Sequence, residues 1–146
     1  PNIELHLTGP LQTNKVKDAI RLFDVFHTLD REKLAKEFVK SEIKENKKFF
    51  IQVNTGREAN KSGVYIEQIE EFTKYCINDL GLNIVGLMCI PPINDKPHEH
   101  FAILANEARK NNLYQLSMGM SSDYHEAIKK ESTYIRIGTA LFGKRQ

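Results

Sequence analysis

Two segments near the C-terminal end of the chain combine glycine with hydroxyl side chains in a way that suits a phosphate group. The first, residues 116–123 (LSMGMSSD), ends an apolar run at a glycine and continues with two serines and an aspartate. The second, residues 136–143 (RIGTALFG), begins at Arg136 and continues through Gly138 and Thr139. Backbone N–H groups at such turns point at an anion, and glycine allows its close approach. One such turn alone is an ordinary helix-capping turn, but two of them beside an arginine favour a phosphate-binding cup.

The elements that must position these turns follow from the pattern of apolar residues. Short apolar runs typical of strands alternate with stretches in which apolar residues recur every three or four positions, as in helices. Six strands are expected, at residues 3–8, 25–29, 49–53, 84–90, 113–118 and 134–137.

Helix ends are marked by residues that suit them. Asp30 is the expected N-cap of the second helix, and Gly81 is expected just past the end of a long helix with apolar residues from 66 to 80. Ser121 or Ser122 is expected to cap the short helix that follows the fifth strand.

Six βα units without a linker predict a parallel sheet covered by helices. Two architectures fit this pattern, an open doubly wound sheet and a (β/α)8 barrel. A barrel typically needs about 250 residues, so the length of 146 residues by itself favours the open sheet.

The composition is that of an ordinary soluble globular domain, with 27% charged and 40% hydrophobic residues. The net charge is only +2, which argues against nucleic acid or a membrane surface as the main partner. No apolar run approaches the roughly 20 residues of a membrane span, and no signal-peptide pattern is present, which favours the cytoplasm. Cys76 and Cys89 make no disulfide framework and are expected to be buried, unreactive thiols.

The order of motifs along the chain resembles the YggS/PROSC family of pyridoxal phosphate homeostasis proteins, which are similar to the N-terminal barrel of alanine racemase. The resemblance covers essentially all 146 residues. It is carried by residues 9–15 (GPLQTNK), 27–30 (HTLD), 52–54 (QVN) with Glu58, Lys61 and Gly63, 86–88 (GLM) before Ile90 and Pro91, 116–123, and 132–143 (STYIRIGTALFG).

This resemblance implies an α/β fold of the (β/α)8 TIM-barrel type, here an incomplete barrel of about six βα units. Residues 1–146 would form the C-terminal three-quarters of a pyridoxal-phosphate-binding barrel domain. In the family, the first strand carries the lysine that bonds to pyridoxal phosphate and the second carries a Gly-Glu-Asn segment, and neither motif occurs here. Pro10 also departs from the histidine usual at its position.

An incomplete barrel has two exposed edges, which are expected at the strands over residues 3–7 and 134–137. Unpaired edge strands expose backbone N–H and C=O groups. The chain alone is therefore expected to be unstable or to aggregate, unless a second chain or a missing N-terminal segment supplies two strands.

By resemblance, the phosphate of pyridoxal 5′-phosphate would lie between the Ser121 turn and the turn of Gly138 and Thr139. Ser121 would contribute its hydroxyl group, and Gly138 and Thr139 their N–H groups. Arg136 would face the cofactor, either at the pyridine nitrogen or at the phosphate, and the sequence does not separate these roles.

Three further residues at strand ends are expected to form the pocket wall, because the functional end of a barrel lies at the C-termini of its strands. They are Asn54, Met88 and Met118. For the two methionines, core packing is the alternative. His6 and His27 lie in expected strands and are interpreted as barrel-interior or packing residues.

No lysine lies where the family places its cofactor-bonding lysine, and Lys15 is expected to be a structural or surface residue. The expected function is therefore non-enzymatic binding of pyridoxal 5′-phosphate in its intracellular homeostasis. The alternatives are a fragment of an amino-acid racemase-like enzyme and an unrelated phosphate-binding α/β module.

Two other clusters are weaker candidates. His98 and His100 resemble a metal pair, but their spacing at a helix start splays the side chains apart. The Lys/Glu-rich run over residues 31–48 is interpreted as a solvated helix face.

Overall fold

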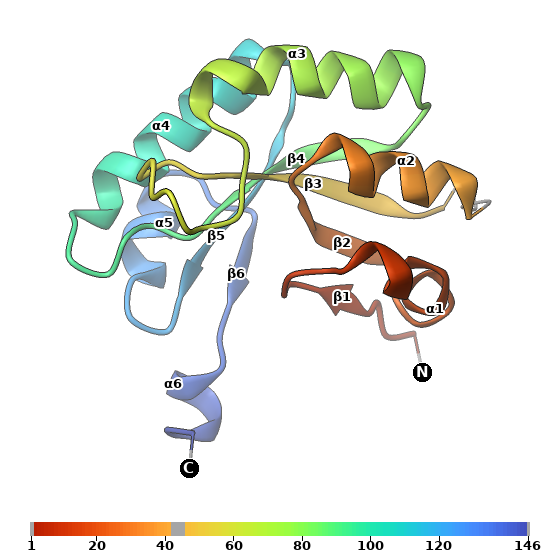
Figure 1. Ribbon diagram of the computed structural model, residues 1–146. Coiled ribbons are helices and arrows are strands. Elements are labelled where there is room, and N and C mark those ends of the chain that lie inside the picture. Colours follow the sequence, from red (N-terminus) through yellow and green to blue (C-terminus); the bar gives the residue numbers. More distant parts are fainter. Residues whose placement is uncertain (1, 42–45, 146) are drawn as a thin grey trace.

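The computed structural model describes residues 2–41 and 46–145. Its centre is one parallel sheet whose six strands follow the order of the sequence. The strands are β1 (His6–Leu7), β2 (Val25–Leu29), β3 (Lys48–Val53), β4 (Ile84–Cys89), β5 (Gln115–Met120) and β6 (Tyr134–Arg136). Because each strand pairs with its neighbour in sequence, the sheet winds in one direction and curls, and β1 and β6 form its edges (Figure 1). A doubly wound sheet reverses its strand order, so that alternative is excluded.

The helices from α1 to α5 pack on one side of this curled sheet, whereas α6 stands apart beyond the end of β6 (Figure 1). Within the described residues, no helix is both long and apolar enough to cross a membrane. The helical segments are η1 (Thr13–Lys15), α1 (Val16–Leu22), α2 (Glu32–Lys40), η2 (Ile66–Gln68), α3 (Ile69–Lys74), η3 (Tyr75–Asp79), α4 (Pro97–Lys110), α5 (Tyr124–Lys129) and α6 (Thr139–Phe142).

Two groups of buried side chains lie on opposite faces of the sheet. The larger group fills the space between sheet and helices, where apolar residues of α2 and α4 such as Phe38 and Leu104 are fully buried. The smaller group consists of Val25, Phe50 and Met88, with Tyr134 packed against it. All five residues of β2 are buried, as expected for a parallel strand covered on both faces.

Most of the expected elements are confirmed, with differences at their ends. Only His6 and Leu7 of the first expected strand are paired as a strand, and β5 extends to Met120. The long helix expected from residue 66 consists of a 3-10 turn, an α-helix and a π-helical turn in succession. Gly81 follows it with a φ of 67°, which confirms its expected place after the helix C-terminus.

The expectation that Asp30 caps α2 is wrong. Arg31 is the N-cap residue, and no side-chain cap hydrogen bond is formed. The carboxylate of Asp30 accepts a hydrogen bond from Arg31 Nη1 at 2.6 Å. Arg31 Nη2 in turn donates to the carbonyl oxygen of Leu11 at 2.9 Å, so this pair ties α2 to the β1–α1 loop.

Candidate functional site

The turns that follow β5 and β6 meet at one place, because parallel neighbouring strands deliver their C-terminal ends to the same edge of the sheet. Ser121 lies in the first turn, and its Oγ accepts the N–H of Ala140 at 2.9 Å and the N–H of Gly138 at 3.3 Å. The two turns are thus joined through one oxygen atom. The N–H groups of the second turn already converge on an oxygen, which is the arrangement that a phosphate oxygen would need.

The hydroxyl group of Ser121 is available for this contact because another residue occupies the N-cap position of α5. Asp123 is the N-cap residue of α5, and its carboxylate accepts the N–H of Met120 at 2.8 Å. The expectation that Ser121 or Ser122 caps α5 is therefore wrong. The carboxylate closes its own turn, and the Ser121 hydroxyl reaches across to the start of α6 instead.

An open cavity of about 740 Å³ lies at the joined turns. Ser121, Arg136, Gly138 and Thr139 all line it, together with Arg145. A Cβ atom added at Gly138 would meet no atom within 4 Å. The space beside Gly138 is therefore open to a ligand, and the surrounding donors are N–H groups, hydroxyls and guanidinium groups, which suit an anion.

Arg136 extends from β6 into the curled sheet. Its Nη1 donates to Ser117 Oγ at 2.5 Å and its Nη2 to the carbonyl oxygen of Cys89 at 3.0 Å. Burial lowers the pKa of Arg136, but a guanidinium stays charged in proteins. Of its five N–H donors, two are thus used by partners among the described residues. A partly buried cation with spare donors is the feature that fits a bound anion or ring nitrogen.

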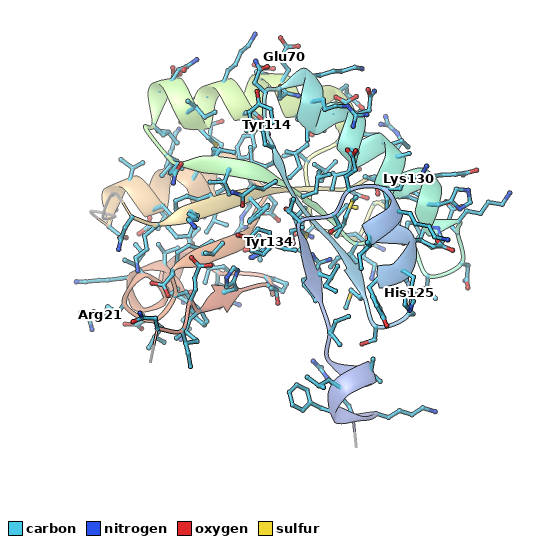
Figure 2. The ribbon with its side chains drawn as sticks, turned by 180° about the vertical axis from the view of Figure 1, so that it is seen from behind. Arg21, Glu70, Tyr114, His125, Lys130 and Tyr134 are labelled. Atoms are coloured by element: carbon cyan, nitrogen blue, oxygen red, sulfur yellow. The ribbon has the colours of Figure 1, made fainter. Side chains whose placement is uncertain are left out.

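A second hollow, of about 460 Å³, adjoins the first, and Arg136 and Gly138 line both. His6, His27 and Tyr134 line it. Seen from behind, Tyr134 lies between β6 and the side of the molecule that holds β1 and β2 (Figure 2). Arg136 therefore borders both the cup formed by the two turns and a hollow lined with aromatic rings.

His27 is the most deeply placed titratable group of this hollow. Its side chain is 1% exposed, and its ring stacks on Phe50 with a centroid distance of 4.5 Å. Its Nδ1 lies 2.7 Å from Ser117 Oγ, and its Nε2 lies 2.8 Å from His6 Nδ1. Burial, followed by the positive charge expected at His6 when protonated and at Arg136, lowers the pKa of His27 to about 3. The interpretation of His27 as an interior residue is confirmed, whereas His6, in the edge strand β1, is only partly buried.

The remaining expected wall residues lie in different places. Met88 is buried on the same face of the sheet as Val25 and Phe50. Met118 is fully buried in the larger group between sheet and helices, so the core-packing alternative holds for it. Asn54 closes its own loop, because its Oδ1 accepts the N–H of Glu58 at 3.1 Å and its Nδ2 donates to the Glu58 carbonyl oxygen at 2.8 Å. The structure therefore gathers Ser121, Arg136, Gly138 and Thr139 at one cavity, and Asn54, Met88 and Met118 do not line it.

Ser117 is the site residue that sequence reasoning missed. It is fully buried in β5 and lies within hydrogen-bond distance of both Arg136 and His27. The available signal was a serine within the expected strand of residues 113–118, which by itself indicates nothing about its partners.

The weaker candidates have structural roles. His100 is buried, with Asp95 Oδ2 at 2.8 Å and Thr55 Oγ1 at 2.9 Å, so it ties α4 to two loops. In the part of the chain that the structure describes, no group of three or more His, Cys, Asp or Glu side chains could hold a metal ion. Lys15 is exposed, as expected.

The charged run agrees with expectation in α2 but not at its end, where Lys47 Nζ donates to the carbonyl oxygen of Phe23 at 2.7 Å and Lys48 begins β3. In α2, Lys36 and Glu32 form an exposed pair at 3.0 Å, whereas residues 42–45 of the run lie outside the described residues. Both cysteines are buried, as expected, and burial raises the pKa of each thiol to about 12.

The sequential parallel sheet with its joined turns defines a barrel-type α/β protein, and the comparison with known families agrees. Residues 2–146 match the family model for the N-terminal domain of alanine racemase, so the chain belongs to this family. An alanine racemase structure from Corynebacterium glutamicum covers 97% of the chain with a TM-score of 0.72 at 17% identity, which supports the fold. The expected incomplete barrel of the TIM-barrel type is thereby confirmed.

Within this family the chain groups with the pyridoxal phosphate homeostasis proteins. It is 38% identical to the one from Aquifex aeolicus (strain VF5), over 99% of this chain and 68% of the relative. It is 41% identical to the one from Vibrio alginolyticus, over 98% of this chain and 66% of the relative. The structure of PipY from Synechococcus elongatus PCC7942 with PLP bound is 30% identical, with a TM-score of 0.83, and the match covers 98% of this chain and 72% of that one. The chain thus spans about two thirds of the length of these curated relatives.

Proposed function

We propose that this chain binds pyridoxal 5′-phosphate (PLP) and takes part in its intracellular homeostasis without catalysing a reaction. The observation that carries the proposal is the pair of turns joined at Ser121, with open space beside Gly138. N–H and hydroxyl donors around an open cavity match a phosphate dianion, and the relatives named above are PLP homeostasis proteins.

In this proposal the phosphate is bound by Ser121, Gly138 and Thr139. Ser121 Oγ now accepts two N–H groups, and a phosphate oxygen would take over as their acceptor while the hydroxyl donates to it. Thr139 adds a hydroxyl and an N–H at the same cavity. The Cβ-free face of Gly138 lets the phosphate approach the backbone.

Arg136 is assigned to the ring end of the cofactor rather than to its phosphate. Its contacts with Ser117 and the Cys89 carbonyl hold the guanidinium on the inner side of the sheet. Bound PLP supplies an aldehyde and an electron-withdrawing ring, and a cation at the ring nitrogen disfavours protonation there. That weakens the ring as an electron sink, which suits a carrier better than a racemase. Met88, buried on the inner face, belongs to the wall near the ring.

The proposal includes a partner that completes the barrel. Residues 1–146 then form the C-terminal three-quarters of a PLP-binding domain, in the cytoplasm. The support is that β1 and β6 are the two edges of the described sheet and border a hollow lined from both sides. A second chain or an N-terminal segment would supply strands between them.

The test separates binding from folding at Gly138. The Gly138→Ala variant should keep the wild-type melting temperature, because its Cβ meets no protein atom within 4 Å. Its affinity for PLP in equilibrium dialysis should fall at least about tenfold, because the methyl group occupies the space of the phosphate. Inorganic phosphate should compete with PLP for the wild-type chain.

The matched control is Gly9→Ala, which also places a Cβ in open space but lies after β1. It should bind PLP like the wild type. Equal PLP affinity of the Gly138→Ala variant and the wild type would refute the phosphate site, and absence of PLP binding by the wild type would refute the function.

A further inference from the structure

Five side chains form one continuous hydrogen-bonded path from the edge of the sheet to the guanidinium of Arg136. From the exposed end, the contacts are Glu4 Oε1 to His6 Nε2 (2.9 Å), His6 Nδ1 to His27 Nε2 (2.8 Å), His27 Nδ1 to Ser117 Oγ (2.7 Å) and Ser117 Oγ to Arg136 Nη1 (2.5 Å). The residues come from four different strands and the segment before β1. No part of this path is needed to bind a phosphate in the cup formed by the two turns.

The direction of each hydrogen bond follows from what each group can donate. Arginine is only a donor, so Ser117 Oγ accepts from Arg136. When both histidines are neutral and Glu4 is ionised, His6 must donate Nε2–H to Glu4. His6 Nδ1 then accepts from His27 Nε2–H, and His27 Nδ1 accepts the hydroxyl hydrogen of Ser117.

Adding one proton to this path reverses the direction of the hydrogen bonds between His6, His27 and Ser117. A protonated His6 donates from both ring nitrogens, so His27 Nε2 becomes an acceptor and its single N–H moves to Nδ1. His27 then donates to Ser117 Oγ, which accepts from His27 and Arg136 together. The hydroxyl hydrogen of Ser117 must turn to another acceptor. The two arrangements differ by one proton, taken from solvent, and His27 has one N–H in both.

The surroundings keep the added charge at the outer end. His27 is buried, its ring is covered by Phe50, and the cation of Arg136 lies beyond Ser117. Burial lowers the pKa of His27 to about 3. This ring therefore stays neutral while the direction of its two hydrogen bonds changes.

The positive charge of a protonated His6 has a carboxylate partner, because His6 Nε2 lies 2.9 Å from Glu4 Oε1. Besides Glu4 and His27, Tyr134 of β6 lies near His6, with a ring centroid distance of 5.6 Å, and Lys48 Nζ of β3 lies 3.4 Å from Glu4 Oε2. Arg136 and Arg145 line the same hollow as His6.

We propose that His27 is the positioning residue of Arg136: it couples the protonation of His6 to the hydroxyl that holds the guanidinium. This inference rests on the proposed function in so far as Arg136 faces bound PLP. The coupling itself is a property of the chain without ligand and can be measured there.

The first experiment uses the full 146-residue chain labelled with ¹⁵N-histidine and free of PLP, with His6→Gln for assignment. Ring ¹⁵N shifts recorded between pH 5 and 9 should show that the N–H of His27 moves from Nε2 to Nδ1 as His6 gains its proton, while His27 stays neutral. In His6→Gln, His27 should no longer change with pH. A single His27 tautomer throughout the titration, or a proton gained by His27 together with His6, would overturn the proposal.

The second experiment compares PLP affinity at pH 6 and pH 8 by equilibrium dialysis. His27→Phe keeps the ring stack but cannot hydrogen-bond. The ratio of the dissociation constant at pH 6 to that at pH 8 should differ at least about threefold between this variant and the wild type. His27→Gln can still hydrogen-bond to both His6 and Ser117. Its affinity for PLP at pH 8 should therefore be closer to that of the wild type than the affinity of His27→Phe is. Ser117→Ala removes the link with little loss of volume and should match His27→Phe.

The matched control is His125→Gln, on the exposed side of α5, which should behave as the wild type. Equal ratios in all variants, or equal losses in His27→Phe and His27→Gln, would reduce His27 to a packing residue. If the wild type bound no PLP, the proposed function would fail, while the ¹⁵N experiment would still decide the coupling.

Discussion

The residue that most depends on its surroundings is His27, whose imidazole is neutral because it is buried. Its pKa of about 3 lies far below the ordinary value near 6.5. Between these two pH values, the imidazole therefore carries an extra proton in the unfolded chain but not in the folded chain. By linkage, the stability due to neutral His27 is complete above about pH 6.5 and is lost as the pH falls toward 3.

We therefore expect the free energy of unfolding to decrease between pH 6.5 and pH 4.5. Urea titrations at several pH values measure it. In His27→Gln this decrease should be clearly smaller, because glutamine does not titrate, although the variant is less stable at pH 7.5. An identical pH dependence in both proteins would contradict the assignment of the buried neutral state.

The two cysteines give a second prediction at the scale of single residues. With thiol pKa values of about 12, Cys76 and Cys89 carry almost no thiolate at pH 8. Both should react with a disulfide reagent such as DTNB at least about 100-fold more slowly in the native chain than in urea. Rapid reaction of one thiol without urea would show that its surroundings open locally.

At the scale of elements, the connection from β5 to α5 depends on Gly119. Its φ is 102°, and an added Cβ would lie 2.6 Å from Ala127 Cβ. The residue lies inside β5 and brings the strand so close to α5 that a side chain has no room.

Gly119→Ala should therefore destabilise the chain by about 2 kcal/mol or more, from the unfavourable φ and the forced displacement of α5 together. Urea denaturation measures the loss. Gly9→Ala, where the added methyl group meets nothing within 4 Å, should change stability by no more than about 0.5 kcal/mol. Similar stabilities of the two variants would show that α5 yields to the methyl group at little cost.

At the scale of the whole molecule, the open seam between β1 and β6 is the dominant feature. Both strands are edges of the described sheet, and apolar side chains border one of them, with Ile3 71% and Leu5 47% exposed. Apolar edges with unpaired backbone groups favour association with other strands. The expectation that the chain alone aggregates stays a prediction.

The double variant Ile3→Lys, Leu5→Lys should shift the chain toward the monomer, because charged side chains at an edge oppose strand pairing. Size-exclusion chromatography with light scattering measures the change. Ile93→Lys is the matched control, since Ile93 is 97% exposed but lies in the β4–α4 loop. A wild-type chain that is monomeric at high concentration and melts cooperatively would contradict the seam as an association surface.

The order and type of the elements could be predicted from the sequence because they rest on local properties. Alternating apolar runs and helical periodicity act within about ten residues, and the run at residues 25–29 became β2 with the same bounds. The glycine and hydroxyl pattern of the last two turns is equally local. These signals therefore indicated Ser121, Gly138 and Thr139, which line one cavity in the structure.

Only the tertiary structure decided which groups meet. Ser117 and His27 are 90 residues apart, and Ser121 and Ala140 are 19 apart, so their contacts depend on how the sheet curls and on the register of its strands. The same packing placed Met118 toward the helices and made Asp123 rather than Ser121 the N-cap residue of α5. The hydrogen-bond partner of a hydroxyl group within an apolar run depends on the neighbouring strands and cannot be identified before they are in place. For that reason the sequence could indicate a phosphate cup but not the path of hydrogen bonds behind it.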